Sequence, residues 1–216
     1  MGTDTGHRTR DSGATRDAIL DAALTVVARD GLRASRMEDV ASEAGVSRQS
    51  VYYHFRSRDE VVSALIDRGL TDLATSIRAS ADNESIDEFV VTAVRFFAAN
   101  QSLCRLLVTE MWGLAGSADQ PRHIVDRAEV DIIAPVAARI ALANEAGEAH
   151  CADPVLAARA LMGQVTGVAF GPIVRNEPLD ADPMEGHLRA YARAVLHSGD
   201  PSAPAEADHG DGGALS

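Results

Sequence analysis

The apolar residues of this 216-residue chain recur at the spacing of α-helices along most of its length. Residues three and four positions apart share one face of a helix, so this repeat buries one side of each helix. The first such face consists of Ala18, Ile19, Ala22, Ala23, Val26 and Val27. No segment alternates apolar and polar residues as a half-buried strand requires. The sequence therefore predicts an all-α protein of about nine helices.

The helix boundaries are marked by capping residues. Asp30-Gly31 ends the first apolar face, because glycine readily takes the left-handed conformation that closes a helix. A Ser followed three residues later by Glu is typical of the first turn of a helix. This pattern predicts three helix starts, at Ser35 and Glu38, Ser57 and Glu60, and Ser85 and Glu88.

The later helices are predicted from apolar periodicity. Asp153-Pro154 is a favourable start, since proline fits the first turn of a helix. Pro135 is expected to kink or break the helix that contains it and to open space beside it. The later helices cover approximately residues 102–115, 121–145, 154–175 and 183–198.

Composition and charge divide the chain into four segments. Residues 1–13 and 199–216 are small and polar, and we predict that both are disordered. The first 60 residues hold 9 Arg against 10 acidic residues, whereas the remaining chain holds 11 Arg against 22 acidic residues. This balance excludes a protein that is basic throughout, as a general nucleic-acid coat would be. We predict a small, locally basic domain over 14–60 and an acidic helical domain over 61–198.

The sequence also argues against several other classes of protein. Cys104 and Cys151 stand far apart, which speaks against a disulfide-built fold and a cysteine zinc site. His150 beside Cys151 offers only two ligands, so we expect no metal or other cofactor. The first residues lack the apolar stretch of a secretory signal. The apolar run 161–174 is too short to span a bilayer, and we expect a cytoplasmic protein.

Residues 35–58, SRMEDVASEAGVSRQSVYYHFRSR, have the pattern of two short helices joined by a tight turn. Gly45 permits the left-handed conformation that such a turn demands. Ser47 is a favourable N-cap for the second helix, 48–54. The small Ala41 lets the two helices cross closely. This is the helix-turn-helix pattern, in which the second helix enters the major groove of DNA.

The second helix of this pattern carries side chains that suit DNA. Arg pairs with guanine and Gln with adenine, while hydroxyls and cations hold phosphates. The alternative is a solvated polar face with aromatic core anchors, and we assign Val51 and Phe55 to the core. The candidate DNA-binding residues are Ser35, Arg36, Ser47, Arg48, Gln49, Ser50, Tyr52, Tyr53, His54 and Arg58.

Residues 15–62 resemble the N-terminal DNA-binding domain of TetR-family transcriptional regulators. The likeness runs through TRDAILDAALTVVARDG and ASRMEDVASEAGVSRQSVYYHFRSRDEVV, and EAGEAHCADPVLAARALMGQVTGVAFG is more weakly similar to the C-terminal half of the family. The chain departs from the family at Gln49-Ser50-Val51, where Gly-Thr-Leu is common, and at Arg58, where Lys is frequent. Gln49 adds a side chain that reaches a base, so the DNA sequence of an operator is not transferable from relatives.

The resemblance implies a homodimer that places two recognition helices in successive major grooves of a palindromic operator, usually as a repressor. Glycine in a helix interior costs about 1 kcal/mol relative to alanine, so three glycines on one face suggest that another helix or a ligand lies close. The alternative is packing against helices of the same chain. The candidate dimer residues are Gly163, Gly167, Gly171, Leu188, Tyr191 and Val195.

The resemblance further implies that the helices over residues 84–145 hold a small-molecule effector. Binding of the effector would favour a dimer with the wrong spacing between its recognition helices. A mostly apolar pocket with adaptable Met and Cys side chains fits this role, and the alternative for each residue is an ordinary core position. The candidate lining residues are Phe96, Phe97, Cys104, Leu107, Met111, Trp112, His123, Met162, Thr166 and Phe170.

Two other functions stay open at this point. An enzyme would require a catalytic group of residues, and no nucleophile, phosphate loop or metal cluster stands out in the sequence. An adaptor would use its helix-turn-helix to contact protein, and its binding would lack the steep salt dependence of DNA binding. Arg8 and Arg10 on the predicted N-terminal arm either stay solvated or reach the DNA.

Overall fold

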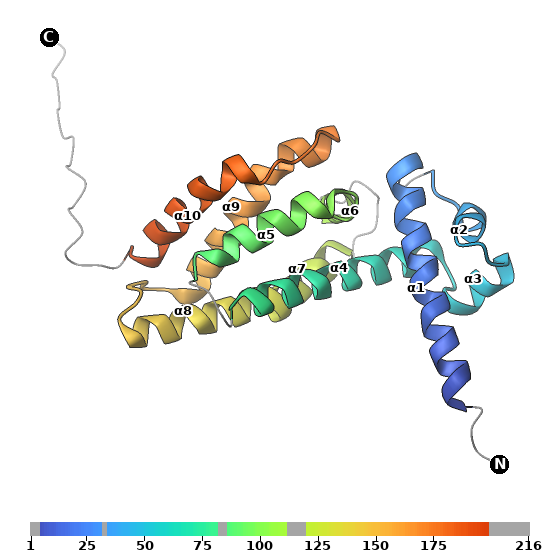
Figure 1. Ribbon diagram of the computed structural model, residues 1–216, viewed down its shortest axis with the longest axis horizontal. Helices are drawn as coiled ribbons and strands as arrows, with labels where there is room; N and C mark the ends of the chain where they lie inside the picture. Colours follow the sequence, from blue (N-terminus) through green and yellow to red (C-terminus); the bar gives the residue numbers. More distant parts are fainter. Residues whose placement is uncertain (1–4, 32–33, 82–85, 112–119, 199–216) are drawn as a thin grey trace, which may run out of the picture.

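The computed structural model describes residues 5–31, 34–81, 86–111 and 120–198, and every regular element in these ranges is helical (Figure 1). The π-helix η1 joins α7 directly to α8, so the three form one continuous helix with a π-helical turn in its middle. Counted in this way, the described residues hold the nine helices that the sequence predicts. The elements are α1 (Thr5–Asp30), α2 (Met37–Glu43), α3 (Arg48–His54), α4 (Arg58–Ala81), α5 (Glu88–Ala99), α6 (Gln101–Met111), α7 (Gln120–Ala128), η1 (Glu129–Ile133), α8 (Ala134–Ala146), α9 (Pro154–Arg175) and α10 (Asp182–Leu196).

Helices α1, α2 and α3 form a small domain at one end of the molecule (Figure 1). Ile19 and Val26 of α1, Val51 of α3 and Phe55 behind α3 are almost fully buried in its core. The guanidinium of Arg16 lies 5.0 Å from the centre of the Phe55 ring, which adds a cation–π contact at the edge of the core. The buried apolar residues of α1 and of the two short helices therefore fix the orientation of α3, and with it the direction of its outward face.

Helix α4 runs from this small domain into the second, larger group of helices (Figure 1). It packs against α1 at one end and against α5, α6, α7 and η1 along its length. Helix α6 comes close to α4 at Gly69, because a Cβ atom there would lie 2.5 Å from the Leu103 side chain of α6. The missing side chain at Gly69 thus lets α4 and α6 meet more closely than larger residues would allow.

Helix α5 occupies the centre of the larger group, with α4 on one side and α9 and α10 on the other (Figure 1). Its apolar residues repeat on nearly all sides, so Phe89, Val90, Val91, Ala93 and Val94 are all buried. A helix that is apolar all round belongs in the interior of a protein. Within the described residues, no helix is both long and apolar enough to span a membrane.

Pro135 coincides with a local change in the hydrogen-bond pattern of its helix. It stands in the first turn of α8, directly after the π-helical turn Glu129–Ile133. Proline has no amide hydrogen to donate to the preceding turn, and the wider π-helical turn lies where this α-helical hydrogen bond is missing. The helix neither ends nor breaks at this residue, as the sequence predicts it could, but passes through it by way of the π-helical turn. Part of η1 lines an apolar cavity.

Two predicted helix starts differ from the structure. Helix α1 begins at Thr5, so residues 5–13 are helical where the sequence predicts a disordered arm. Once a helix has formed, each added residue gains a hydrogen bond, and extension toward the N-terminus costs little. The Ser35 capping box does not form: Arg36 is the N-cap of α2, and the Ser35 hydroxyl donates to the Gly31 carbonyl at 2.8 Å.

Of the remaining predicted helix ends, the start at Ser57 lies within the described residues and others do not. The Ser57 hydroxyl accepts from the Glu60 amide at 3.2 Å, and the Glu60 carboxylate accepts from the Arg56 amide at 2.7 Å. This second bond reaches one residue further back than a standard capping box. Ser85, the predicted tail 199–216 and residues 112–115 of the predicted 102–115 helix lie outside the described residues.

Candidate nucleic-acid interface and internal cavity

Helix α3 is held by one apolar face and presents the other to solvent. Val51 is fully buried, and Phe55 directly follows the helix with 1% of its surface exposed. On the opposite side, 81% of Tyr53 is exposed. The Ser47 hydroxyl accepts from the Ser50 amide at 3.1 Å and thereby caps the first turn. The helix is therefore fixed in place while its polar face stays free.

Arg48 leads this polar face and is already held in an outward position. Its guanidinium lies 2.8 Å from the Glu38 carboxylate of α2 and 5.4 Å from the centre of the Tyr52 ring. A hydrogen bond with Tyr52 and the charge of Glu38 raise the pKa of Arg48 above its usual value. The group stays a cation at any working pH, and a phosphate or base edge would compete with Glu38 for it.

The remaining predicted contacts on α3 are exposed or half-buried. Gln49 is exposed beside Arg48, and His54 packs edge-on against Tyr53 with ring centres 5.2 Å apart. Arg36 is exposed at the start of α2. Ser35, by contrast, is 8% exposed and its hydroxyl is engaged by Gly31, so it lies behind this surface. Eight of the ten predicted residues are thus exposed or half-buried in or directly before α2 and α3, namely Arg36, Ser47, Arg48, Gln49, Ser50, Tyr52, Tyr53 and His54.

Arg58 is placed differently from the phosphate contact that the sequence predicts. It begins α4, is half-buried, and its Nε has no hydrogen-bond partner among the described residues. Its charge acts on Glu110 of α6, a buried residue. Burial raises the pKa of Glu110 above its usual value, the nearby Arg58 opposes that rise, and Asp59 adds to it. Arg58 therefore faces the junction between the two groups of helices.

An apolar cavity of about 100 Å³ lies in the larger group of helices. Of the predicted lining residues, Phe97, Cys104, Leu107, Met162 and Thr166 surround it. Burial raises the pKa of the Cys104 thiol to about 12, so this group is uncharged. The lining residues that sequence reasoning missed come mainly from α4, α7 and η1: Leu70, Leu73, Val108, Ile124, Ala128, Ile132, Ile133 and Ile173.

Three predicted lining residues lie elsewhere. Phe96 packs against the core without reaching the cavity, and 41% of Phe170 is exposed. The His123 ring nitrogen is 2.8 Å from the Asp67 carboxylate of α4, which holds the side chain outside the cavity. Trp112 and the side chain of Met111 lie outside the described part of the chain.

Arg105 of α6 links the two groups of helices, and sequence reasoning did not identify it. Its guanidinium donates to the Ala28 carbonyl of α1 at 2.9 Å and to the Asn176 side chain at the end of α9. Asn176 has a φ of 55° and closes α9 in the left-handed conformation. The sequence marks Arg105 only as a charged residue among apolar helical neighbours. Its partners could not be predicted, because they lie more than 70 residues away in the sequence.

The predicted dimer residues fall into two groups. A Cβ atom on Gly163 or Gly167 would meet nothing within 4 Å, so no helix that the structure describes packs against these glycines. Tyr191 is 37% exposed. The prediction for Leu188 is wrong, because this residue is 1% exposed and packs in the core. The described structure places the remaining two, Gly171 and Val195, at half-buried positions.

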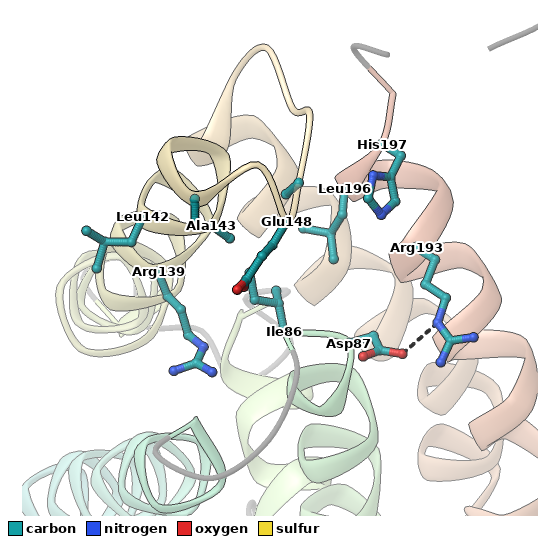
Figure 2. Close-up of a pocket in the computed structure, with 11 residues that line it drawn as sticks. Ile86, Asp87, Arg139, Leu142, Ala143, Glu148, Arg193, Leu196 and His197 are labelled. Atoms are coloured by element: carbon teal, nitrogen blue, oxygen red, sulfur yellow. Dashed lines mark hydrogen bonds and ion pairs between the residues drawn. The ribbon is translucent and has the colours of Figure 1, made fainter. Parts of the chain in front are cut away.

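A second, open cleft of about 570 Å³ lies between α8, the start of α5 and the end of α10 (Figure 2). Arg139 and Arg193 stand on opposite sides of it, and Arg193 is 2.9 Å from the buried carboxylate of Asp87. Glu148 adds a second acid. Charges of both signs line the cleft, so they do not converge on one kind of ligand. No group of three or more potential metal ligands occurs in the described residues.

Comparison with known proteins identifies the N-terminal part of the chain. Residues 19–65 match the family model for bacterial regulatory proteins of the tetR family. The chain is 31% identical over 121 residues to the HTH-type transcriptional repressor SCO4008 of Streptomyces coelicolor, covering 56% of this chain and 60% of that protein. It is 33% identical over 88 residues to the repressor KstR2 of Rhodococcus jostii, covering 39% and 43%. The chain thus spans less than two thirds of these curated relatives.

Solved structures resemble the chain over a greater length. FadR from Bacillus subtilis, solved in complex with stearoyl-CoA, has a TM-score of 0.71, and the match covers 83% of this chain and 98% of that chain at 16% identity. PfmR from Thermus thermophilus has a TM-score of 0.61, with 82% and 96% covered at 22% identity. At these identities the likeness shows the fold alone.

Proposed function

The chain belongs to the TetR family of bacterial regulatory proteins, and from that membership we propose that it is a DNA-binding transcriptional repressor that works as a homodimer and responds to an apolar small molecule. The observation that carries the proposal is the outward polar face of α3, fixed by the buried Val51 and Phe55 on its other side. Membership of a family of regulators decides against the enzyme alternative.

Helix α3 supplies both kinds of contact that DNA recognition needs. Arg48 and Gln49 in its first turn are the base-reading pair, because Arg matches guanine and Gln matches adenine in the major groove. Tyr53 near its end, with Arg36 and Arg56 nearby, binds phosphates and sets the position of the helix. Arg56 is exposed directly after the helix. This division assigns sequence preference to one end of α3 and general affinity to the other.

Replacing Gln49 by Ala is expected to relax the preference for one base pair of the operator. A bidentate contact discriminates by about 1–3 kcal/mol, so the ratio between preferred and altered duplexes should fall by about 5- to 150-fold. The matched control is Arg56→Ala, which should weaken binding equally for every duplex. Titration of both variants against duplexes that differ at single positions measures this. An unchanged order of preference in Gln49→Ala would remove Gln49 from the reading surface.

The proposed dimer uses the exposed face of α9. Gly163 and Gly167 leave room for a second helix to approach closely, and the exposed Leu156 and Val174 extend the apolar surface along the same helix. Tyr191 of α10 continues it. A two-fold pair of such faces gives a four-helix bundle. The open space at the glycines supports this arrangement. The proposed interface leaves out the buried Leu188 and uses exposed residues of α9 in its place.

The effector is proposed to act from the internal cavity. In the Bacillus subtilis FadR structure stearoyl-CoA is bound, which supports a small-molecule effector for this chain as well. Helices α6 and α9 both line the cavity, and Arg105 joins these helices to α1. A ligand that separates α6 from α9 would disturb this link and move the small domain. Coupling of about 1–3 kcal/mol would change operator affinity roughly 5- to 150-fold.

Replacing Arg105 by Ala is expected to weaken the link between the two groups of helices. Hydrogen bonds of a charged group contribute about 1.5–3 kcal/mol, so unfolding free energy should fall by about that amount and operator affinity should change. The control is Arg175→Ala, whose exposed ion pair with Glu177 is local, and which should alter stability by less than about 1 kcal/mol. Denaturant unfolding and DNA titration measure both. Equal effects of the two variants would contradict a special role for Arg105.

A further inference from the structure

The walls of the internal cavity are almost entirely hydrocarbon. Ten of its thirteen lining side chains contain only carbon and hydrogen beyond the backbone, and none carries a charge. The three exceptions are Cys104, Met162 and Thr166. Whatever occupies the cavity is therefore surrounded mainly by Leu, Ile, Val and Phe side chains.

The three exceptions do not provide a strong anchor for a polar ligand. The Thr166 hydroxyl is 3.0 Å from the carbonyls of both Met162 and Gly163, so its hydrogen is already donated within its own helix and only its oxygen is left to accept a hydrogen bond. Burial keeps the Cys104 thiol protonated, and a thiol is only a weak hydrogen-bond donor. The Met162 thioether is a weak acceptor at best.

These walls select against polar ligands. A hydroxyl or amide that leaves water for a site without a partner loses about 1–3 kcal/mol by mutational measures, and an ionised group loses far more. Water itself needs two to four polar partners to be held in a cavity, and this cavity does not offer them. A hydrocarbon gains free energy on entry because it leaves water and contacts close-packed carbon atoms.

The size of the cavity limits the ligand further. It measures about 100 Å³, whereas a cavity of about 150 Å³ lined by the same residue types binds benzene or xenon. We propose that this cavity recognises a compact, uncharged hydrocarbon of about the size of benzene, without any directed hydrogen bond. This inference rests on the proposed function, because it assigns a chemical class to the effector proposed there.

Calorimetric titration of the full chain with benzene, phenol and benzoate tests the inference. The three molecules share one ring and differ only in polarity. Benzene is expected to bind and benzoate not to bind. Phenol is expected to bind at least about tenfold more weakly than benzene, because its hydroxyl would leave water for walls that offer at most the Thr166 oxygen as an acceptor. Tighter binding of phenol or benzoate than of benzene would overturn the proposal.

Variants locate the binding within the cavity. Ala128→Leu fills space in the wall and should abolish benzene binding, whereas Ala138→Leu on the exposed side of α8 should leave it unchanged. Thr166→Val keeps the shape of the wall without the hydroxyl and should also leave benzene affinity unchanged within about twofold. If Ala128→Leu loses its cooperative unfolding transition, Cys104→Met is the second filling variant. Benzene binding that survives in the folded filling variant would overturn the assignment.

Titration with duplex DNA in the same samples distinguishes a failure of the effector assignment from a failure of the proposed DNA-binding function. Salt-sensitive DNA binding without any added ligand tests the proposed function alone. Benzene should then change the affinity for DNA by about 5- to 150-fold in the wild-type chain but not in the filling variant. Benzene binding with unchanged DNA affinity would overturn the effector assignment while leaving the DNA-binding function intact.

Discussion

Raising the salt concentration from about 50 to about 200 mM is expected to weaken binding of operator DNA by about a thousandfold. A protein that neutralises six to ten phosphates loses about 10³–10⁵ in affinity over this interval, because it no longer gains as much from releasing counterions. Arg36 and Arg56 are assigned to phosphates, and Arg48 carries its charge into the same field of the DNA backbone when it reads a base, so a dimer brings about six cations to the DNA. The acidic larger domain adds none, so the expected value lies at the lower end of this range.

The slope of this salt dependence is the quantity to measure. A plot of the logarithm of the association constant against the logarithm of salt concentration falls by about 0.9 for each phosphate contact. Removal of Arg56 by an Ala substitution should reduce the slope by about two in a dimer, since each copy loses one contact. A flat salt dependence would instead favour the alternative in which the helix-turn-helix contacts another protein.

Replacing Phe55 by Ala is expected to destabilise the small domain severely and to abolish DNA binding. Phe55 is 1% exposed beneath the ring-stacked Arg16, and a buried Phe→Ala substitution costs about 3–5 kcal/mol. Typical domains have only about 5–15 kcal/mol of stability in total. The loss should appear as a lower midpoint in denaturant unfolding, together with loss of binding to duplex DNA.

Tyr53→Ala is the matched control, because Tyr53 lies two residues earlier and is 81% exposed. Its stability should stay within about 0.5 kcal/mol of the wild type, as expected for a surface substitution, while its affinity for all duplexes falls. The contrast separates an aromatic residue that supports α3 from one that contacts phosphate. Wild-type DNA binding by Tyr53→Ala, or unchanged stability of Phe55→Ala, would contradict these assignments.

The helix-turn-helix could be predicted from sequence because its signals are local. Gly45 has a φ of 66°, Ser47 caps α3, and Val51 and Phe55 point inward, and each of these follows from residue type and spacing within a dozen positions. Ser35 shows the limit of such rules. Its neighbours fit a capping box, but its hydroxyl instead bonds to Gly31, a choice that depends on how α1 meets α2.

The cavity and the dimer face depend on packing between distant segments. Leu188 and Tyr191 belong to the same apolar stripe in sequence, yet Leu188 is in the core and Tyr191 is partly exposed, because the neighbours of α10 decide which part of the stripe is covered. Arg105 and Ala28 are 77 residues apart, and no local pattern relates them. Five of the ten residues predicted to line the cavity do so, whereas the contribution of α4, α7 and η1 required the fold.

Selection of bound duplexes from a random pool by the full-length wild-type chain tests the central claim most directly. The claim is that two copies present the Arg48-to-His54 face of α3 to two successive major grooves. The expected result is enrichment of an inverted repeat whose half-sites are centred about one helical turn apart, roughly 34–36 Å. A pool that shows no enrichment over scrambled competitor, in the absence of any small molecule, would contradict the account.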